Sequence, residues 1–157
     1  MRYHLYREQQ LNCNIEEVWD FFSSPLNLSK ITPQDMKFTV VSNLRNIPIY
    51  EGMEIDYLVS PVLGIPLKWK TKITQVNYQK SFTDLQAKGP YKYWNHYHEF
   101  IENDKGVLMK DSVDYELPFG LLGKVVHSLF VHKRLRSIFE FRYNFLEGYF
   151  NRKKIIQ

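Results

Sequence analysis

Residues 92–117 read KYWNHYHEFIENDKGVLMKDSVDYEL, and this stretch decides the fold. Successive side chains of a strand point to opposite faces of its sheet, so residues two apart share a face. Apolar and polar residues alternate in both halves of the stretch, and Asn103–Gly106 between them has the composition of a hairpin turn. The sequence therefore predicts two long antiparallel strands, over 92–103 and 107–117.

The same period of two continues upstream, over residues 38–41, 53–59, 67–73 and 81–88. The segment 67–73 is the clearest, because its three lysines fall on one side and its apolar residues on the other. One wet face and one buried face are typical of an antiparallel sheet. With a first strand over residues 3–12, these segments predict a sheet of about six or seven strands.

Two short helices are expected after the first strand. Asn14 can cap a helix and Glu17 follows three residues later, which is the spacing of a capping box. Apolar residues at helical spacing run from Ile15 to Phe22, and core packing explains this stripe. Residues 26–31 could form the second short helix.

After Pro118 the apolar spacing returns to that of a helix. A straight helix over 120–150 would be about 45 Å long, so a bend or break near 130–134 is expected. A sheet with one apolar face must be covered, and this helix is the obvious cover. The fold class is therefore α+β, in one domain over 1–157. The helical stripes are Leu122, Val125, Val126 and Leu129, then Leu135, Ile138, Phe139, Arg142, Leu146 and Tyr149.

Composition limits the function classes. The single cysteine, Cys13, excludes an internal disulfide framework, and neither a signal-peptide run nor an apolar stretch of membrane-spanning length is present. We therefore expect a cytoplasmic location. The formal charge of +4 permits weak attraction to nucleic acid. However, no aromatic residue shares the face of Lys68, Lys70 and Lys72, so no nucleic-acid partner is expected.

Several segments carry a resemblance to a known family: Asn14–Phe22, Gly89–Tyr91, Trp94–Phe100, Met109–Tyr115, Pro118–Gly120, Leu135–Phe139 and Arg142. Their order resembles the helix-grip fold of the START-like superfamily, also called SRPBCC proteins. The likeness is to small bacterial ligand-binding or polyketide cyclase/dehydrase-like members. It implies a curved antiparallel sheet wrapped around a long C-terminal helix, with a ligand cavity between them. It does not choose among lipid carriers, cyclases, hydrolysis activators and quinone-binding proteins.

A polar group is expected inside this otherwise apolar cavity. Strand parity places His96 and His98 on the inward face of one strand and Asp111 on that of the next, with Asp84 and Gln86 on the preceding strand. Buried ionisable groups need partners. Three interpretations remain open: the side chains satisfy one another structurally, they orient a ligand's polar end, or they form a catalytic acid/base set.

Metal binding is a further hypothesis within the catalytic one. Two histidines one residue apart on a strand point the same way and can share a metal ion, but a third ligand is needed. Asp111 is the candidate that the sequence offers. Without a stronger signal we expect no metal and no cofactor.

The leading hypothesis is binding or carriage of a small apolar molecule, such as a lipid, an isoprenoid quinone or a polyketide-like aromatic. The enzyme alternative is a cyclase or dehydratase using His96, His98 and Asp111. The second alternative is an accessory protein-interaction module, with transient membrane or protein contact through the apolar loops at 62–66 and 118–122. The expected ligand-binding residues are Tyr57, Trp69, Phe82, Asp84, Gln86, Trp94, His96, His98, Phe100, Asp111, Tyr115, Phe130 and Phe139.

Overall fold

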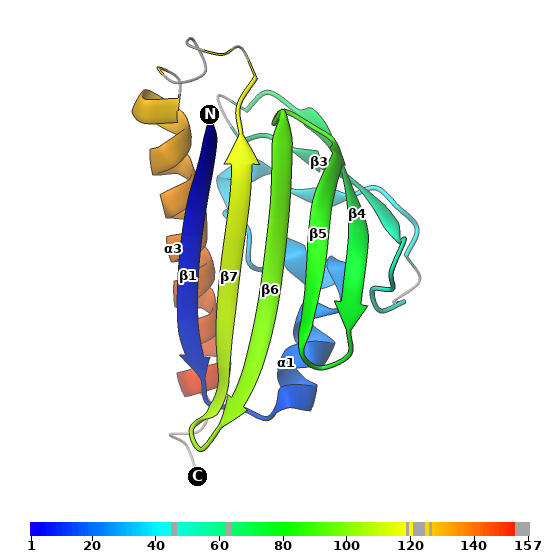
Figure 1. Cartoon of the computed structure of the whole chain (residues 1–157), viewed down its shortest axis with the longest axis vertical. Helices are drawn as coiled ribbons and strands as arrows, with labels where there is room; N and C mark the ends of the chain where they lie inside the picture. Colours follow the sequence, from blue (N-terminus) through cyan, green and yellow to red (C-terminus); the bar gives the residue numbers. More distant parts are fainter. Residues whose placement is uncertain (45–46, 62–63, 119, 121–124, 126, 153–157) are drawn as a thin grey trace.

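Seven antiparallel strands form one curved sheet in the computed structural model of the chain (Figure 1). The structure describes residues 1–44, 47–61, 64–118, 120, 125 and 127–152, and the count refers to these. The strands are β1 (Arg2–Leu11), β2 (Thr39–Val40), β3 (Glu54–Val59), β4 (Leu67–Asn77), β5 (Ser81–Lys88), β6 (Tyr93–Asn103) and β7 (Gly106–Glu116). Their spatial order is β1-β7-β6-β5-β4-β3-β2, so the first strand closes against the last and the others form a meander. The predicted fold class is confirmed.

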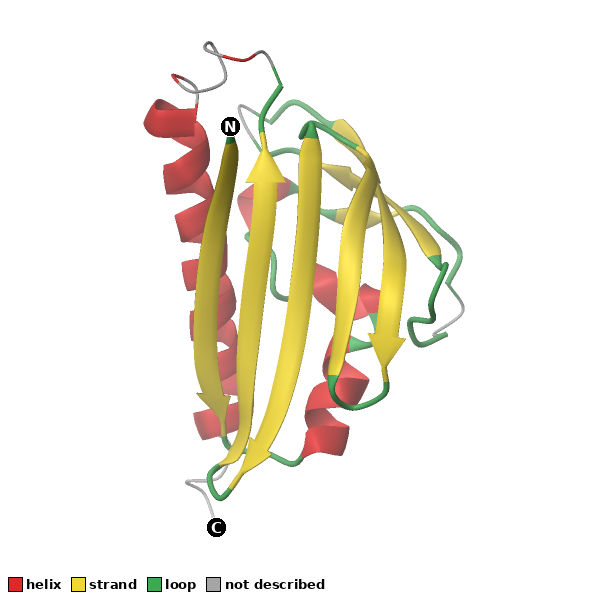
Figure 2. Ribbon diagram, viewed as in Figure 1, coloured by secondary structure: helices red, strands yellow, loops and turns green. Residues whose placement is uncertain are grey.

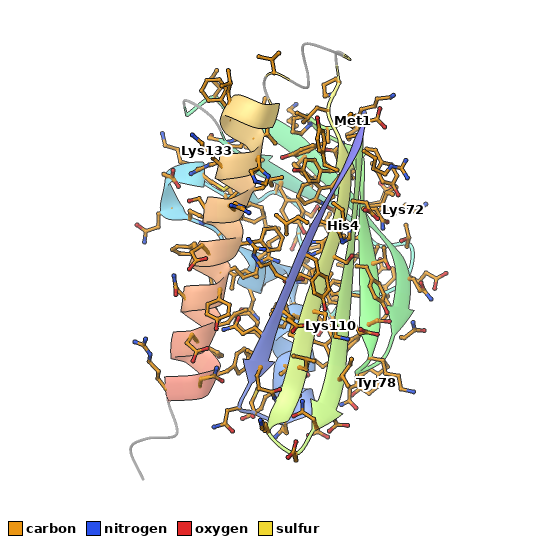
Figure 3. The ribbon with its side chains drawn as sticks, turned by 60° about the vertical axis from the view of Figure 1, so that its left-hand side comes forward. Met1, His4, Lys72, Tyr78, Lys110 and Lys133 are labelled. Atoms are coloured by element: carbon orange, nitrogen blue, oxygen red, sulfur yellow. The ribbon has the colours of Figure 1, made fainter. Side chains whose placement is uncertain are left out.

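The helical segments lie on one side of the sheet, which curls around them (Figure 2). They are α1 (Ile15–Phe22), the 3₁₀ turns η1 (Pro25–Ser29) and η2 (Gln34–Met36), the π-helical η3 (His127–Val131), α3 (His132–Leu146) and the π-helical η4 (Glu147–Asn151). Figure 3 shows α3 facing the sheet across a layer of side chains. Among the described residues, no helix is both long and apolar enough to cross a membrane.

The start of α1 follows the sequence prediction closely. The Glu17 backbone N–H donates to Asn14 Oδ1 at 2.8 Å, and the Asn14 N–H donates to Glu17 Oε2 at 3.2 Å. This reciprocal capping box satisfies two N–H groups that a helix end leaves open. The second predicted helix is instead the 3₁₀ turn η1, which begins at Pro25.

The predicted break in the C-terminal helix is a change of helical type rather than an interruption. Hydrogen bonding changes from π to α at His132, inside the predicted segment, and the chain continues as one helix (Figure 1). A π turn accommodates an extra residue without ending a helix, which explains why the apolar stripes shift phase there. Of the first predicted stripe, Leu122 and Val126 lie outside the described residues.

Strands β6 and β7 have the predicted register and faces. His98 lies opposite Asp111, and Trp94 lies opposite Tyr115. On both strands the inward positions are buried and the alternate ones are not. Strand β5 adds Asp84 opposite His96 on the other side of β6. The register of three neighbouring strands thus brings four ionisable side chains together.

The hairpin between β6 and β7 packs closely against the end of β1, and substitution of its glycine tests this contact. Gly106 has a φ of +117°, and a Cβ there would collide with the backbone of Leu11 and Cys13. Gly52 has a φ of +90° but nothing within 4 Å of such a Cβ. We expect Gly106→Ala to lower the free energy of unfolding by about 3 kcal/mol and Gly52→Ala by only about 1 kcal/mol. Urea denaturation of the two variants measures this, and equal losses would contradict the packing argument.

Candidate functional site

A cavity of about 380 Å³ lies between the sheet and α3. Its wall is mainly apolar, with aromatic side chains from β3 to β6 on one side and aliphatic and aromatic side chains of α3 on the other. Residues from α1 to η2 close a further side. The apolar lining includes Phe22, Ile31, Met36, Phe38, Ile55, Tyr57, Trp69, Phe82, Trp94, Leu135, Ile138 and Phe139.

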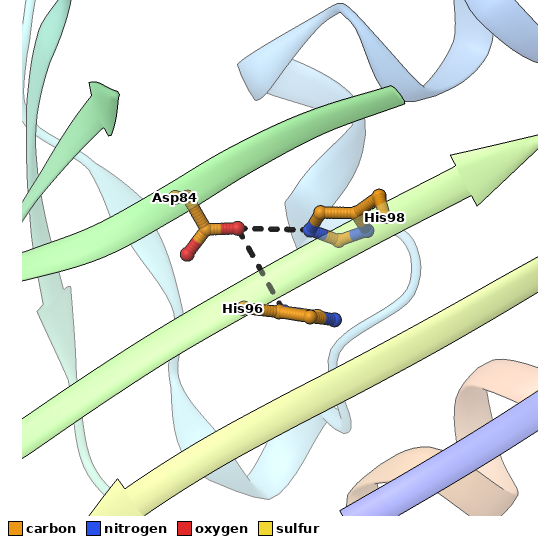
Figure 4. A group of neighbouring side chains, drawn as sticks. All are labelled: Asp84, His96 and His98. Carbon is orange, nitrogen blue, oxygen red and sulfur yellow. Dashed lines mark hydrogen bonds and ion pairs between the residues drawn. The ribbon is translucent and has the colours of Figure 1, made fainter. Parts of the chain in front are cut away.

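Two adjacent imidazoles, whose ring planes are tilted by 33°, form the polar part of this wall. The ring centroids of His96 and His98 are 3.7 Å apart, because residues two apart on β6 share a face. On the β5 side, Asp84 Oδ2 lies 2.8 Å from His98 Nε2 and 3.7 Å from His96 Nδ1 (Figure 4). The Asp84 side chain is 19% exposed and lines the cavity together with both imidazoles.

A second carboxylate holds the opposite edges of the same two rings. Asp111 Oδ1 lies 2.9 Å from His96 Nε2, with which it forms a hydrogen bond. It is also 2.9 Å from His98 Nδ1, although that nitrogen is not aligned for a hydrogen bond. Asp111 is only 1% exposed. The imidazoles therefore lie between two carboxylates, one open to the cavity and one sealed behind it.

Arg142 of α3 completes the polar cluster. Its side chain is 9% exposed, and Nη1 lies 3.6 Å from Asp111 Oδ2, which is too long for a hydrogen bond. Its Nε and Nη1 have no hydrogen-bond partner, and the guanidinium carbon lies 4.8 Å from the centre of the Phe139 ring. The residue lines the cavity. Arg142 thus presents a buried cation with unused donors.

Burial and mutual contact shift the pKa values of this cluster in different directions. Burial would raise the pKa of Asp84 and Asp111, but the imidazoles favour the ionised carboxylates and hold both values below the ordinary range, that of Asp111 well below. Burial lowers the pKa of His96, and the adjacent His98 lowers it further. Burial also opposes charge on His98, yet its contacts with Asp111 and Asp84 outweigh this and raise its pKa. Of the two imidazoles, His98 therefore holds a proton more readily than His96, and its protonation gives a state with one neutral and one charged ring.

This state balances charge inside the protein. The two carboxylates are matched by Arg142 and the His98 imidazolium. A buried charge without such compensation is expensive, so each member depends on the others. The arrangement can hold a ligand's polar end, transfer a proton through His98, or bind a metal ion through Asp84, His96 and His98, whose ligand atoms lie within 4.8 Å of one another.

Most residues expected in the site line the cavity: Tyr57, Trp69, Phe82, Asp84, Trp94, His96, His98 and Phe139. Asp111 lies behind the imidazoles, because β7 passes farther from the cavity than β6. Gln86 is turned away, since its side-chain amide donates to the carbonyl of Tyr91 at 2.7 Å and accepts from the same residue's N–H at 3.2 Å. Gln86 lies opposite Thr71 of β4 and so keeps the alternation with Asp84, but these two bonds hold its amide out of the cavity lining.

Three aromatic residues expected in the wall lie elsewhere. Phe100 packs in the core against Trp19 and Phe22, with ring centroids 6.1 and 5.4 Å away, because β6 passes under α1 at that level. Tyr115 stacks on Tyr3 of the neighbouring strand at 5.5 Å. Phe130 lies in the π-helical η3 and is 60% exposed. These three placements correct the predicted lining.

Sequence reasoning missed Arg142 as a site residue, and also Tyr91 and the lining contributed by α1 to η2. A cation on the apolar stripe of the last helix was the available signal for Arg142. Phe22 and its neighbours were not expected in the site, because core packing already explained the helical spacing of apolar residues there. Which part of that stripe faces a cavity depends on how far α3 stands from the sheet, and no local pattern encodes this distance.

Comparisons with known proteins agree on the fold. No family model matches the chain, and no curated protein matches its sequence. Solved structures do match over nearly the whole chain. The ginseng major latex-like protein 151 from Panax ginseng is 14% identical, with 96% of this chain and 98% of that one covered and a TM-score of 0.68.

Two further structures are similar to the same extent. Protein Ms6760 from Mycobacterium smegmatis is 18% identical over 93% of this chain and 92% of its own, with a TM-score of 0.64. A norcoclaurine synthase point mutant from Thalictrum flavum, in complex with a transition state analogue, is 14% identical over 95% and 96%, also at 0.64. Such low identities show the fold alone. The fold of this chain is a helix-grip fold, with a cavity between the sheet and the terminal helix. More specifically, it is the START-like (SRPBCC) fold, as the sequence predicts.

The charge balance predicts a pH-dependent cost for losing Asp111. We expect Asp111→Asn to lower the free energy of unfolding at pH 7 by about 3–5 kcal/mol, because buried cations lose their counter-charge. The folded-state pKa of Asp111 lies below the unfolded value of about 3.9. Its stabilisation is therefore fully present above about pH 4 and is lost as the pH falls through the folded-state pKa.

Urea denaturation at several pH values measures the difference between this variant and the wild type. Asp114→Asn is the matched control, because Asp114 lies on the same strand and pairs with His4 at 2.9 Å, but 43% of its side chain is exposed. We expect this control to cost less than about 1 kcal/mol. A loss for Asp111→Asn that stays constant down to pH 3 would contradict the charge argument.

Proposed function

We propose that this protein binds a small, largely apolar molecule in the cavity between the sheet and α3. The observation that carries the proposal is a cavity of about 380 Å³ with an apolar wall and one compact polar cluster. Ligand pockets typically enclose about 300–1,000 Å³ and combine apolar walls with a few well-placed polar groups. The volume is at the low end of that range, which favours one compact molecule over a lipid with several chains.

The polar cluster indicates the chemistry of one end of the ligand. Two N–H donors of Arg142 have no partner, although the side chain is more than nine-tenths buried. An unsatisfied buried donor costs about 1–3 kcal/mol, which a ligand oxygen would offset. A carboxylate, phenolate or carbonyl oxygen suits this position. A fatty acid, an isoprenoid quinone and a polyketide-like aromatic all have such an oxygen.

The aromatic wall favours a ligand that contains a ring. Trp69 and Trp94 meet edge to face with centroids 5.4 Å apart, and Tyr91 packs within 5.6 Å of both. Rigid ring edges and faces of this kind form specific contacts with another ring. Among the three ligand classes, a quinone or a polyketide-like aromatic therefore fits better than a saturated chain.

Catalysis is the second candidate, and one observation favours it. The His98 imidazole has a raised pKa and contacts Asp84, which faces the cavity. Such a pair can deliver a proton to a bound molecule. The norcoclaurine synthase structure holds a transition state analogue on the same fold. We place binding first because both imidazoles are already held between carboxylates. A cyclase or dehydratase would need His98 for turnover, whereas binding would survive His98→Gln.

The interaction-module hypothesis depends on the loops at 62–66 and 118–122. Residues 62, 63, 119, 121 and 122 lie outside the described part of the chain. Within it, Ile65 is 55% exposed and borders the cavity, and the Arg134 Nε–H donates to the carbonyl of Pro61 at 3.0 Å. These contacts favour a role for the first loop at the cavity mouth, so ligand entry remains the more economical proposal.

Two fluorescent probes test the proposal: anilinonaphthalene sulfonate, which is anionic, and the neutral phenylnaphthylamine. We expect both to bind the purified protein, and we expect Arg142→Met to weaken the anionic probe by about 10-fold or more, since a hydrogen bond to a charged group contributes about 1.5–3 kcal/mol. Binding of the neutral probe should change by less than about threefold, because methionine keeps the apolar stem.

Arg136→Met is the control, since Arg136 lies on the same helix and is exposed. It should leave both affinities unchanged. Native mass spectrometry of the protein, before and after solvent extraction, would identify a co-purifying molecule. Failure of both probes to bind the folded protein would contradict the proposed function, as would equal losses for the two arginine variants.

A further inference from the structure

Three metal-ligand atoms converge on the cavity side of the polar cluster. Asp84 Oδ2, His96 Nδ1 and His98 Nε2 come from the neighbouring strands β5 and β6, and Figure 4 shows the carboxylate directed toward both rings. The oxygen lies 2.8 and 3.7 Å from the two nitrogens, and all three atoms lie within 4.8 Å of one another. In a tetrahedral site with bonds of about 2.0–2.2 Å, ligand atoms are about 3.3–3.6 Å apart. The observed oxygen–nitrogen distances fall on either side of that range.

The outer edges of the imidazoles supply an independent observation. A histidine that binds a metal usually donates its other ring N–H to a carboxylate, which fixes the tautomer and the ring orientation. Here His96 Nε2 forms such a hydrogen bond with Asp111 Oδ1 at 2.9 Å, and His98 Nδ1 lies 2.9 Å from the same oxygen, although it is not aligned for a hydrogen bond. The ring nitrogens that face the cavity are thereby left as the metal-binding ones. Within the part of the chain that the structure describes, the exposed His4–Asp114 pair has neither a second imidazole nor a second carboxylate among its polar contacts.

We propose that Asp84, His96 and His98 bind a divalent transition metal ion, Zn²⁺ or Fe²⁺, with Asp111 positioning both imidazoles from behind. Two histidines and one carboxylate are the donor set of open Zn²⁺ sites and of non-haem Fe²⁺ sites. All three residues line the cavity, so the remaining coordination positions face the space where a ligand would lie. Binding of the ion would replace the hydrogen bond between His98 Nε2 and Asp84 Oδ2.

The net charge of the cluster with a metal ion bound agrees with the ligand chemistry inferred above. This step of the argument rests on the proposed function. With both imidazoles neutral, a divalent ion and Arg142 outweigh the two carboxylates by one positive charge. A ligand with one negatively charged oxygen would restore neutrality. The sequence favoured no metal because Asp111 was the only third ligand that it offered. The structure instead places Asp84 in that position and Asp111 behind the rings.

The test uses the metal alone, on the full chain after treatment with a chelator. We expect Co²⁺ titration to produce visible ligand-field absorption that saturates at one equivalent per chain and is displaced by Zn²⁺. Asp84→Asn and His98→Gln should abolish this absorption. Asp111→Asn should weaken binding by about 10- to 100-fold, because the ligands remain but their orientation is lost. The control His4→Gln, which removes an exposed histidine, should bind as the wild type does.

Wild-type protein that is folded by circular dichroism but gives no ligand-field bands would overturn the proposal, and this outcome does not depend on any variant folding. Binding that persists in Asp84→Asn and disappears in His4→Gln would also overturn it, by placing the metal on the surface. The neutral fluorescent probe separates the two proposals. If it binds the chelator-treated protein that shows no Co²⁺ bands, the metal proposal alone fails.

Discussion

Two adjacent imidazoles held between two carboxylates are the constraint on which the rest of this structure depends. Asp84, His96 and Asp111 lie on three neighbouring strands, and Arg142 approaches from the helix that covers them. A register slip of one residue would turn a strand's side chains to the opposite face and leave buried charges without partners. The cluster therefore fixes the relative positions of β5, β6, β7 and α3 more strictly than apolar contacts, which tolerate sliding, could do.

The cavity follows from how α3 is anchored around that cluster. Toward the C-terminal end of the chain, Leu146 of α3 and Phe150 of η4 pack into an apolar core with residues of α1. Toward the N-terminal end of α3, Leu135 and Phe139 pack with Trp94 in a second core. Between the two cores the sheet presents imidazoles and a carboxylate, against which an apolar helix surface gains little. The helix is thus packed at both ends, and the cavity lies between these contacts, with the polar cluster as one part of a mainly apolar wall.

The sequence predicted those features that depend on local periodicity. The alternation in residues 92–117 was sufficient to place both histidines and Asp111 inside, because strand parity needs no knowledge of the partner strands. Parity also placed Asp84 and Gln86 on one face of β5, but Gln86 does not line the cavity, because its amide bonds to the backbone of Tyr91 and strand parity cannot predict such a contact. Two features depend on the distance between helix and sheet. One is the place of Arg142 in the site, and the other is the position of Asp111 behind the imidazoles instead of in the cavity wall. That distance is set by long-range packing, so no pattern of spacing could reveal it.

Stability alone is a weak explanation for this cluster. Apolar residues of similar volume commonly stabilise a fold as well as a buried ion pair does, or better. Here Asp111 Oδ2 and two N–H groups of Arg142 also lack hydrogen-bond partners, each at a cost of about 1–3 kcal/mol. These costs are large for a domain whose net stability is about 5–15 kcal/mol. An occupant that neutralises Arg142 or coordinates the inner ring nitrogens would recover part of them. These unpaired polar atoms are therefore an argument for binding, because a ligand or a metal ion would offset part of their cost.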